Sequence, residues 1–179
     1  MTVSILMGLL IAAVAGVIWY MVPKSIHHTV EGVKYRLGIE NKDFEESVTV
    51  NINGKMKRNF KGERIFTGTI HIENEELPVP VNQRELVIKF FGDNSPALIA
   101  YRGYSDDSLY AYNYGSMYTN ADMSEFSIEV NEQYGPDRSG WNGGDGLMIS
   151  APASDRTEAL KISNRYFMAR WKDQVKPLE

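Results

Sequence analysis

Alternation of apolar and polar residues runs through the middle of the chain and predicts a series of short β-strands. In residues 47–53 three apolar residues alternate with polar ones, which places the apolar side chains on one face of a strand. The dipeptide Asn53-Gly54 supplies a two-residue turn that tolerates positive φ, so we expect a hairpin with a return strand over 55–60. The same pattern predicts further strands at 66–72, 86–91, 97–101, 109–114, 126–130 and 147–150.

The last forty residues change from strands to a loop and a helix. Residues 137–146 are rich in glycine and are typical of a loop. Asp155 and Glu158 form the D-x-x-E pattern that starts a helix, which we expect to continue to about Lys172. A broad apolar stripe along this segment predicts that the helix packs on the sheet.

The beginning of the chain is apolar without interruption. Residues 3–22 are twenty consecutive residues without a charge, and a helix of that length spans roughly 30 Å, the thickness of the hydrocarbon core. Trp19 and Tyr20 lie at its end, as in membrane interfaces, and Pro23-Lys24 ends the run. We predict a transmembrane helix. The alternative is a cleavable signal peptide, because 13–15 reads Ala-Val-Ala, but no basic residue precedes the apolar run.

These patterns together predict an α+β protein. We expect an N-terminal transmembrane helix followed by a mainly antiparallel β-sheet, a sandwich or a partial barrel, packed with a C-terminal amphipathic helix. Residues 1–23 form the transmembrane anchor in this interpretation, 24–32 a juxtamembrane linker, and 33–179 a β-rich soluble domain.

The orientation of the predicted anchor has two interpretations. Basic residues follow the apolar run and none precedes it, so the positive-inside rule places the domain in the cytoplasm. A long domain can translocate regardless of such a small bias. We expect a single-pass protein of the cell membrane with an extracytoplasmic domain.

Composition and charge exclude several kinds of chemistry. The 179 residues include no cysteine, which excludes disulfides, a thiolate nucleophile and cysteine metal sites. The three histidines lack metal-ligand spacing, so we predict no metal and no cofactor. The net charge of −4 argues against a nucleic-acid partner. No nucleophile motif occurs, so we do not predict an enzyme, although a carboxylate-dependent envelope hydrolase would use acids such as Asp106, Asp107 and Asp145.

Aromatic residues supply the candidate binding surface. Six tyrosines fall between positions 101 and 118, and Tyr110, Tyr112 and Tyr114 share one strand face. An exposed tyrosine ladder would stack on sugar rings or anchor a protein, whereas a covered one would be core. Trp141 lies in the glycine-rich loop, where we expect a turn with the indole packed over it, although such a loop would also suit an anion or calcium. Tyr110, Tyr112, Tyr114 and Trp141 form the candidate surface.

Two further groups of residues predict contacts with partners. Lys55, Lys57, Arg58 and Lys61 form a basic segment that would meet anionic lipid or an envelope polymer, or would simply be solvated. Gly8, Ala12 and Gly16 are spaced four apart on one helix face, which predicts a homodimer through the membrane helix, although composition alone also produces this pattern. The partners we expect are thus the lipid bilayer and an unknown protein or envelope polymer.

The stretch GDGLMISAPASDRTEALKISNRYF (144–167), with the Asn-Gly hairpin and the apolar beginning, resembles uncharacterised small membrane-anchored proteins of Gram-positive bacteria. The resemblance implies an envelope location and no activity. We therefore expect a membrane-anchored extracytoplasmic binding or interaction module of unknown ligand. The alternatives are the carboxylate-dependent envelope hydrolase and a membrane adaptor that faces the cytoplasm.

Overall fold

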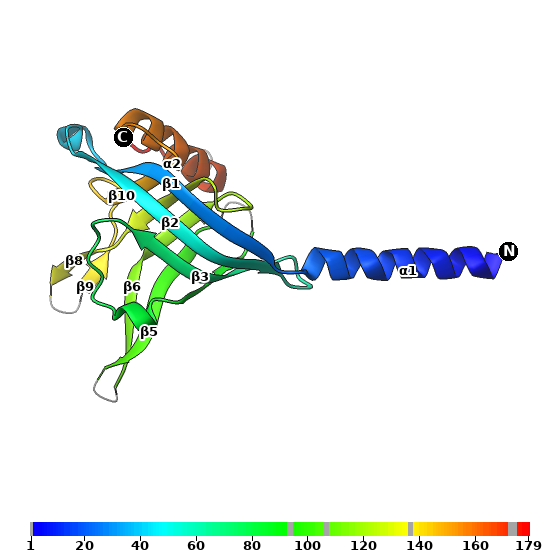
Figure 1. Cartoon of the computed structure of the whole chain (residues 1–179). Coiled ribbons are helices and arrows are strands. Elements are labelled where there is room, and N and C mark those ends of the chain that lie inside the picture. Colours follow the sequence, from blue (N-terminus) through cyan, green and yellow to red (C-terminus); the bar gives the residue numbers. More distant parts are fainter. Residues whose placement is uncertain (1, 93–94, 106–107, 136–137, 172–174) are drawn as a thin grey trace.

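The computed structural model describes residues 2–92, 95–105, 108–135, 138–171 and 175–179. Its main feature is one antiparallel sheet of eight strands in the spatial order β4-β3-β2-β1-β10-β7-β6-β5 (Figure 1). These strands are β1 (Lys24–Arg36), β2 (Glu45–Arg58), β3 (Arg64–Ile72), β4 (Leu86–Phe90), β5 (Ala97–Ser105), β6 (Ser108–Thr119), β7 (Phe126–Val130) and β10 (Leu147–Ala151).

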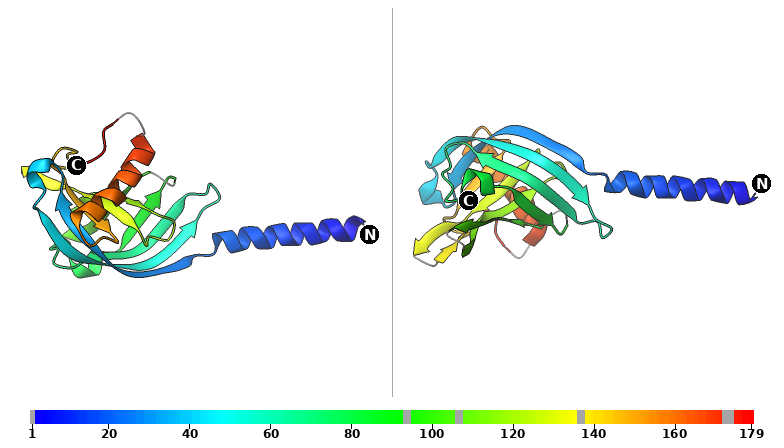
Figure 2. Two further views of the ribbon diagram at one scale, coloured as in Figure 1. Left: turned by 90° about the horizontal axis from the view of Figure 1, so that it is seen from above. Right: turned by 60° about the horizontal axis from the view of Figure 1, so that its bottom comes forward.

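The remaining elements surround this sheet. A small second sheet pairs β8 (Glu132–Gly135) with β9 (Arg138–Gly140), and short 3-10 helices cover Ile39–Asn41 and Val81–Gln83. The helix α2 (Arg156–Trp171) lies across one face of the curled sheet, and α1 (Thr2–Met21) projects away from the strands (Figures 1 and 2). The predicted β-rich domain is therefore confirmed, and its curled main sheet corresponds to the partial barrel and not to the sandwich.

The sheet is buried on both faces in its centre. The strands contribute alternate residues to an enclosed core on the inner face, including Val50, Phe66 and Phe126, each fully buried. On the outer face, residues of β1, β6 and β10 pack under α2 in a second cluster that includes Tyr35 and Ile162. Because β10 is covered on both sides, all five of its residues are buried, which explains why four of the five are apolar.

The helix α2 begins with the predicted cap. The backbone N–H of Glu158 donates to the carboxylate of Asp155 at 2.8 Å, and the carboxylate of Glu158 accepts from the backbone N–H of Ser154 at 3.0 Å. These bonds satisfy donors that a helix N-terminus otherwise leaves unpaired.

The prediction of a hairpin turn at Asn53-Gly54 is wrong. β2 continues through this dipeptide, and Gly54 pairs with Ile26 of β1 and with Gly68 of β3. The turn comes later, where the N–H of Gly62 donates to the carbonyl of Asn59 at 3.0 Å and Gly62 adopts φ +78°. Gly54 is needed because a Cβ there would lie 2.7 Å from the ring of Phe66, not because the chain reverses.

The prediction of a transmembrane anchor over residues 1–23 is also wrong. No helix in the described part of the chain is both long and apolar enough to cross a membrane. This finding overturns the predicted single-pass protein of the cell membrane.

The predicted linker over residues 24–32 is a strand. These residues belong to β1, and Lys24 to Gly32 pair with Met56 to Val48 of β2. The β-rich domain therefore begins about nine residues before the predicted boundary at position 33.

Candidate functional site

The tyrosine ladder lines the inside of the curled sheet. Tyr114 is buried, whereas Tyr110 and Tyr112 are half-buried and pack against the inner core. Tyr112 stacks on Tyr101 of the neighbouring strand with ring centroids 6.3 Å apart. Burial raises the pKa of Tyr101 to about 12, so its hydroxyl stays neutral. Of the two alternatives for the ladder, the structure shows a wall of the core and not an exposed surface.

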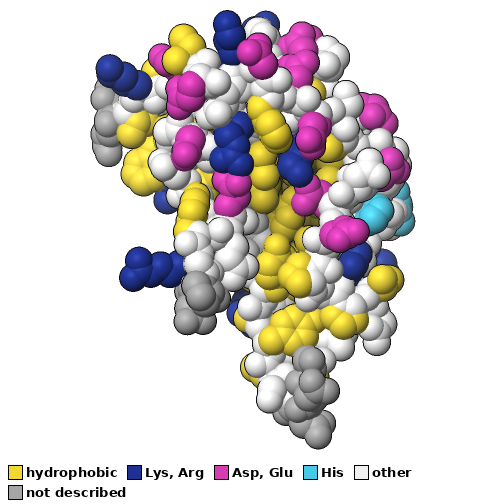
Figure 3. Space-filling model, turned by 90° about the vertical axis from the view of Figure 1, so that its left-hand side faces the viewer, with side chains coloured by type: hydrophobic (Ala, Val, Ile, Leu, Met, Phe, Trp, Pro, Cys, Tyr) yellow, Lys and Arg dark blue, Asp and Glu magenta, His cyan; other side chains and the backbone are white. Residues whose placement is uncertain are grey.

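A connecting segment, residues 73–85, crosses the open side of the sheet. Lys34 of β1 forms an ion pair with Glu75. The amide of Gln83 pairs with the backbone of Tyr104, accepting at 2.9 Å and donating at 3.2 Å. A cavity of about 470 Å³ lies between this segment and Tyr110, with apolar lining from residues 77–80. Figure 3 views the molecule from this side and shows apolar side chains in a strip between charged ones.

A second cavity, which we call the aromatic pocket, lies on the α2 side of the sheet. Its volume is about 370 Å³. Strands, loop and helix each contribute to its wall, and its described lining consists of Pro96, Tyr118, Glu129, Trp141, Phe167, Arg170, Trp171 and Val175.

The strand pattern explains why an acid faces this pocket. In β7, Phe126, Ile128 and Val130 fill the inner core, so Ser127 and Glu129 point to the other face, beneath α2. The position of Glu129 next to β6 places its carboxylate 3.4 Å from the hydroxyl of Tyr118, which donates to it.

Glu129 has an unusual electrostatic environment. Burial raises the pKa of its carboxyl group to about 7, while the hydrogen bond from Tyr118 and the positive charge of Arg170 lower it by less. No cation of the described residues lies within ion-pair distance of Glu129. The pocket therefore contains a carboxyl group that changes its charge near neutral pH.

The glycine-rich loop holds Trp141 in the wall of the aromatic pocket. The N–H of Gly146 donates to the carbonyl of Asn142 at 2.7 Å, which closes a turn. A Cβ on Gly146 would lie 2.4 Å from the indole nitrogen of Trp141, so only glycine leaves room for the indole. The structure thus contains the turn with Trp141 packed over it, and it separates Trp141 from the tyrosine ladder, which lies on the opposite face of the sheet.

The C-terminal turn of α2 supplies the outer wall. Phe167 and Trp171 are one helical turn apart, with ring centroids 6.4 Å apart. The guanidinium of Arg170 lies 5.2 Å from the centroid of the Trp171 ring and donates to the hydroxyl of Ser95 at 3.3 Å.

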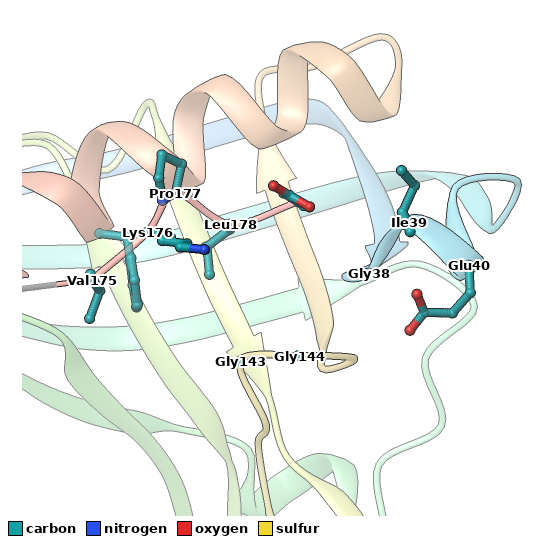
Figure 4. A pocket seen from close by; sticks show the side chains of 11 residues that line it. Gly38, Ile39, Glu40, Gly143, Gly144, Val175, Lys176, Pro177 and Leu178 are labelled. Atoms are coloured by element: carbon teal, nitrogen blue, oxygen red, sulfur yellow. The ribbon is translucent and has the colours of Figure 1, made fainter.

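A third cavity borders the aromatic pocket and shares Phe167 and Val175 with it. Figure 4 shows this cavity, of about 480 Å³, between the segment 175–179 and the loops at Gly38 and Gly143. Leu178 is buried, and the side chain of Asn164 both accepts from and donates to its backbone, at 2.7 Å and 3.0 Å.

The basic segment lies beside α1, at the far end of β2. Arg58 lies over the ring of Tyr20, 5.5 Å from its centroid, and Lys24 lies 5.2 Å from the ring of Trp19. The contact of Lys55, Lys57, Arg58 and Lys61 with lipid or polymer stays a prediction. Pairing through Gly8, Ala12 and Gly16 also stays a prediction, and the space around both glycines is open.

The acids considered for a hydrolase do not form a described site. Asp106 and Asp107 lie outside the described residues. Asp145 is exposed on the glycine-rich loop, where its backbone carbonyl accepts from Arg36 at 2.8 Å.

Sequence reasoning missed Glu129, Tyr118, Phe167 and Trp171 as a group. One signal was present: an acid inside the apolar strand 126–130, on the face that the helix must cover. The chain matches no protein-family model, no curated protein and no solved structure. The resemblance to small envelope proteins therefore stays a prediction, and the aromatic pocket is interpreted from its own geometry.

Proposed function

We propose that this protein is a binding module and that the aromatic pocket is where it binds a small ligand. The observation that carries the proposal is Glu129, a mostly buried carboxyl group at the wall of an aromatic cavity that forms no ion pair with any described residue. A cavity of about 370 Å³ is within the range of small-molecule sites, which are mainly apolar with few polar groups.

The surrounding polar residues support a role for Glu129 in binding. Under α2, the hydroxyl oxygens of Ser127 and Ser150 lie 2.9 Å apart, and the hydroxyl of Tyr35 donates to the hydroxyl oxygen of Ser163 at 2.8 Å. These buried groups satisfy one another within the fold. Among the described residues Glu129 accepts a single long hydrogen bond, from Tyr118, so with respect to them its carboxylate keeps free acceptor capacity at the wall of the cavity.

Binding is proposed in preference to catalysis because of the number of acids. Glu129 is the single carboxyl group among the described residues that line the pocket. Carboxylate-dependent glycoside hydrolysis requires two acids on opposite sides of the bond that is cleaved.

A fragment screen on the purified full chain tests this function. Ligand-observed NMR would be recorded with neutral, anionic and cationic fragments, on the wild type and on the Trp171→Ala variant. We expect fragments that bind the wild type and are lost in the variant, because Trp171 forms the outer wall of the pocket.

The matched control is Phe60→Ala, which removes an aromatic side chain that is 85% exposed and does not line the pocket. This variant should bind as the wild type does. Absence of any bound fragment, or equal loss in both variants, would contradict the proposal.

A further inference from the structure

The walls of the aromatic pocket have the electrostatic character that attracts a cation. The faces of aromatic rings carry partial negative charge, and a cation within about 6 Å of a ring centroid is stabilised by it. Tyr118 and Trp141 bring rings from the sheet side, and Phe167 and Trp171 bring rings from α2. Glu129 adds a full negative charge between them when it is ionised.

A cation of the chain already lies at the edge of this pocket. The guanidinium of Arg170 is 5.2 Å from the ring centroid of Trp171, and its charge lowers the pKa of Glu129. Arg170 is nevertheless exposed, and its described hydrogen bond is a single one to Ser95. Because an exposed arginine gives up such contacts at small cost, this side chain can leave the pocket to another cation.

From these contacts we infer that the ligand of the aromatic pocket is a small quaternary ammonium compound, held by the aromatic rings with Glu129 as its counter-ion and displacing Arg170. This inference rests on the proposed function and specifies its ligand. A quaternary ammonium group has no N–H donors, so the free-energy cost of removing its hydration is small when it enters an aromatic pocket. It also requires no further acceptors from the walls, which offer few.

The charge of Glu129 makes the binding depend on pH. Glu129 is ionised in about one molecule in ten at pH 6 and about nine in ten at pH 8, so affinity should rise about tenfold between these values. Among the described residues, Tyr118 and Arg170 are the other titratable or charged groups that act on it. Burial raises the pKa of Tyr118 above its ordinary value, so its hydroxyl stays neutral in this range.

Calorimetric titration with choline chloride tests the inference on the full chain at pH 8.5, where Glu129 is ionised. The neutral isostere 3,3-dimethylbutan-1-ol has the same shape without the charge, so it should bind at least tenfold more weakly. Equal affinity for the two compounds would overturn the inference.

Two variants should shift choline affinity in opposite directions. Glu129→Gln should weaken it about tenfold or more, because it keeps the shape and removes the charge. Arg170→Gln should tighten it about two- to fivefold, because it removes the competing cation. The control Glu76→Gln changes the net charge equally at an exposed position and should have no effect. Near-ultraviolet circular dichroism would verify that each variant is folded.

Failure of the inference can be separated from failure of the proposed function. If neutral fragments bind in a Trp171-dependent manner and choline does not bind, the inference is overturned and the binding module stands. If choline binds and the Glu129→Gln variant binds it equally well, the counter-ion assignment is overturned. If nothing binds, both are overturned.

Discussion

Glu129 is a residue at which the proposed binding site and the stability of the fold are opposed. An ionised carboxylate beneath α2 loses much of its contact with water, and among the described residues one long hydrogen bond compensates for that loss. A neutral side chain of the same size would fit this position without the free-energy cost of burying a charge. A carboxyl group at such a position is typical of functional sites, where stability and activity are often opposed.

The pH dependence of stability provides a test at the residue scale. Because the pKa of Glu129 is raised to about 7 in the folded state, its contribution to stability is fully present below the ordinary pKa of glutamate and is lost as the pH rises to about 7. Glu129→Gln should therefore be more stable than the wild type by about 2 kcal/mol at pH 8 and nearly equal to it at pH 4.

Urea unfolding of both proteins at the two pH values measures this difference. A variant that loses stability at pH 8, or a difference that is the same at both pH values, would show that Glu129 is a supporting residue of the fold. The variant that gains stability should also be the one that loses choline.

At the scale of elements, the pairing of β2 with β3 depends on two glycines that face each other. Gly54 and Gly68 are register partners, and the ring of Phe66 lies across Gly54. A side chain on Gly54 would also meet the carbonyl oxygen of Thr67 at 2.4 Å. The two backbones approach so closely that neither strand tolerates a Cβ there.

Substitution of Gly54 distinguishes this close approach from a turn. Gly54→Ala should lower the free energy of unfolding by about 1–3 kcal/mol, because the added methyl group displaces β3 or Phe66. Gly135→Ala is the control, since a Cβ there meets nothing within 4 Å, and it should change stability by less than about 0.5 kcal/mol. Thermal unfolding followed by circular dichroism measures both, and equal effects would contradict the assigned register.

The same glycine illustrates what the sequence could and could not predict. Strands 126–130 and 147–150 and the helix cap at Asp155 were predictable because each depends on neighbouring residues. Asn53-Gly54 was misread because the local signal for a turn is identical to the one left by a close approach between strands. The aromatic pocket was not predictable, because its walls come from strands, a loop and a helix that only the completed sheet brings together.

At the scale of the whole molecule, the segment 175–179 binds both α2 and the loop at Gly38. Its backbone is bound to α2 through Asn164, and the carbonyl of Glu179 accepts from the N–H of Gly38 at 2.6 Å. Val175, in the same segment, lines both the aromatic pocket and its neighbour. A shift of this segment should therefore change the affinity of the aromatic pocket for its ligand, although the segment contributes little to the lining of that pocket.

Asn164 tests this connection. Asn164→Ala removes both hydrogen bonds to Leu178 and should cost about 1–2 kcal/mol of stability, with a few-fold loss of choline affinity. Asn164→Asp keeps the acceptor for the N–H of Leu178 and should lose less of both. Hydrogen exchange at the amide of Leu178 should speed up in the order wild type, aspartate, alanine, and unchanged exchange in the alanine variant would contradict the assignment.

The place of β1 between β2 and β10 has a consequence for biosynthesis on the ribosome. β2 follows β1 directly, so the four strands β1 to β4 can pair as they emerge, but the other edge of β1 must wait for β10. Tyr35 of β1 and Ser150 of β10, whose hydroxyls lie 3.4 Å apart, are separated by 115 positions. A nascent chain that stalls in this interval exposes the open edge of β1 to other chains. Chaperones would be needed at this stage of synthesis. Since α2 is made later still, the aromatic pocket forms only after that edge has closed.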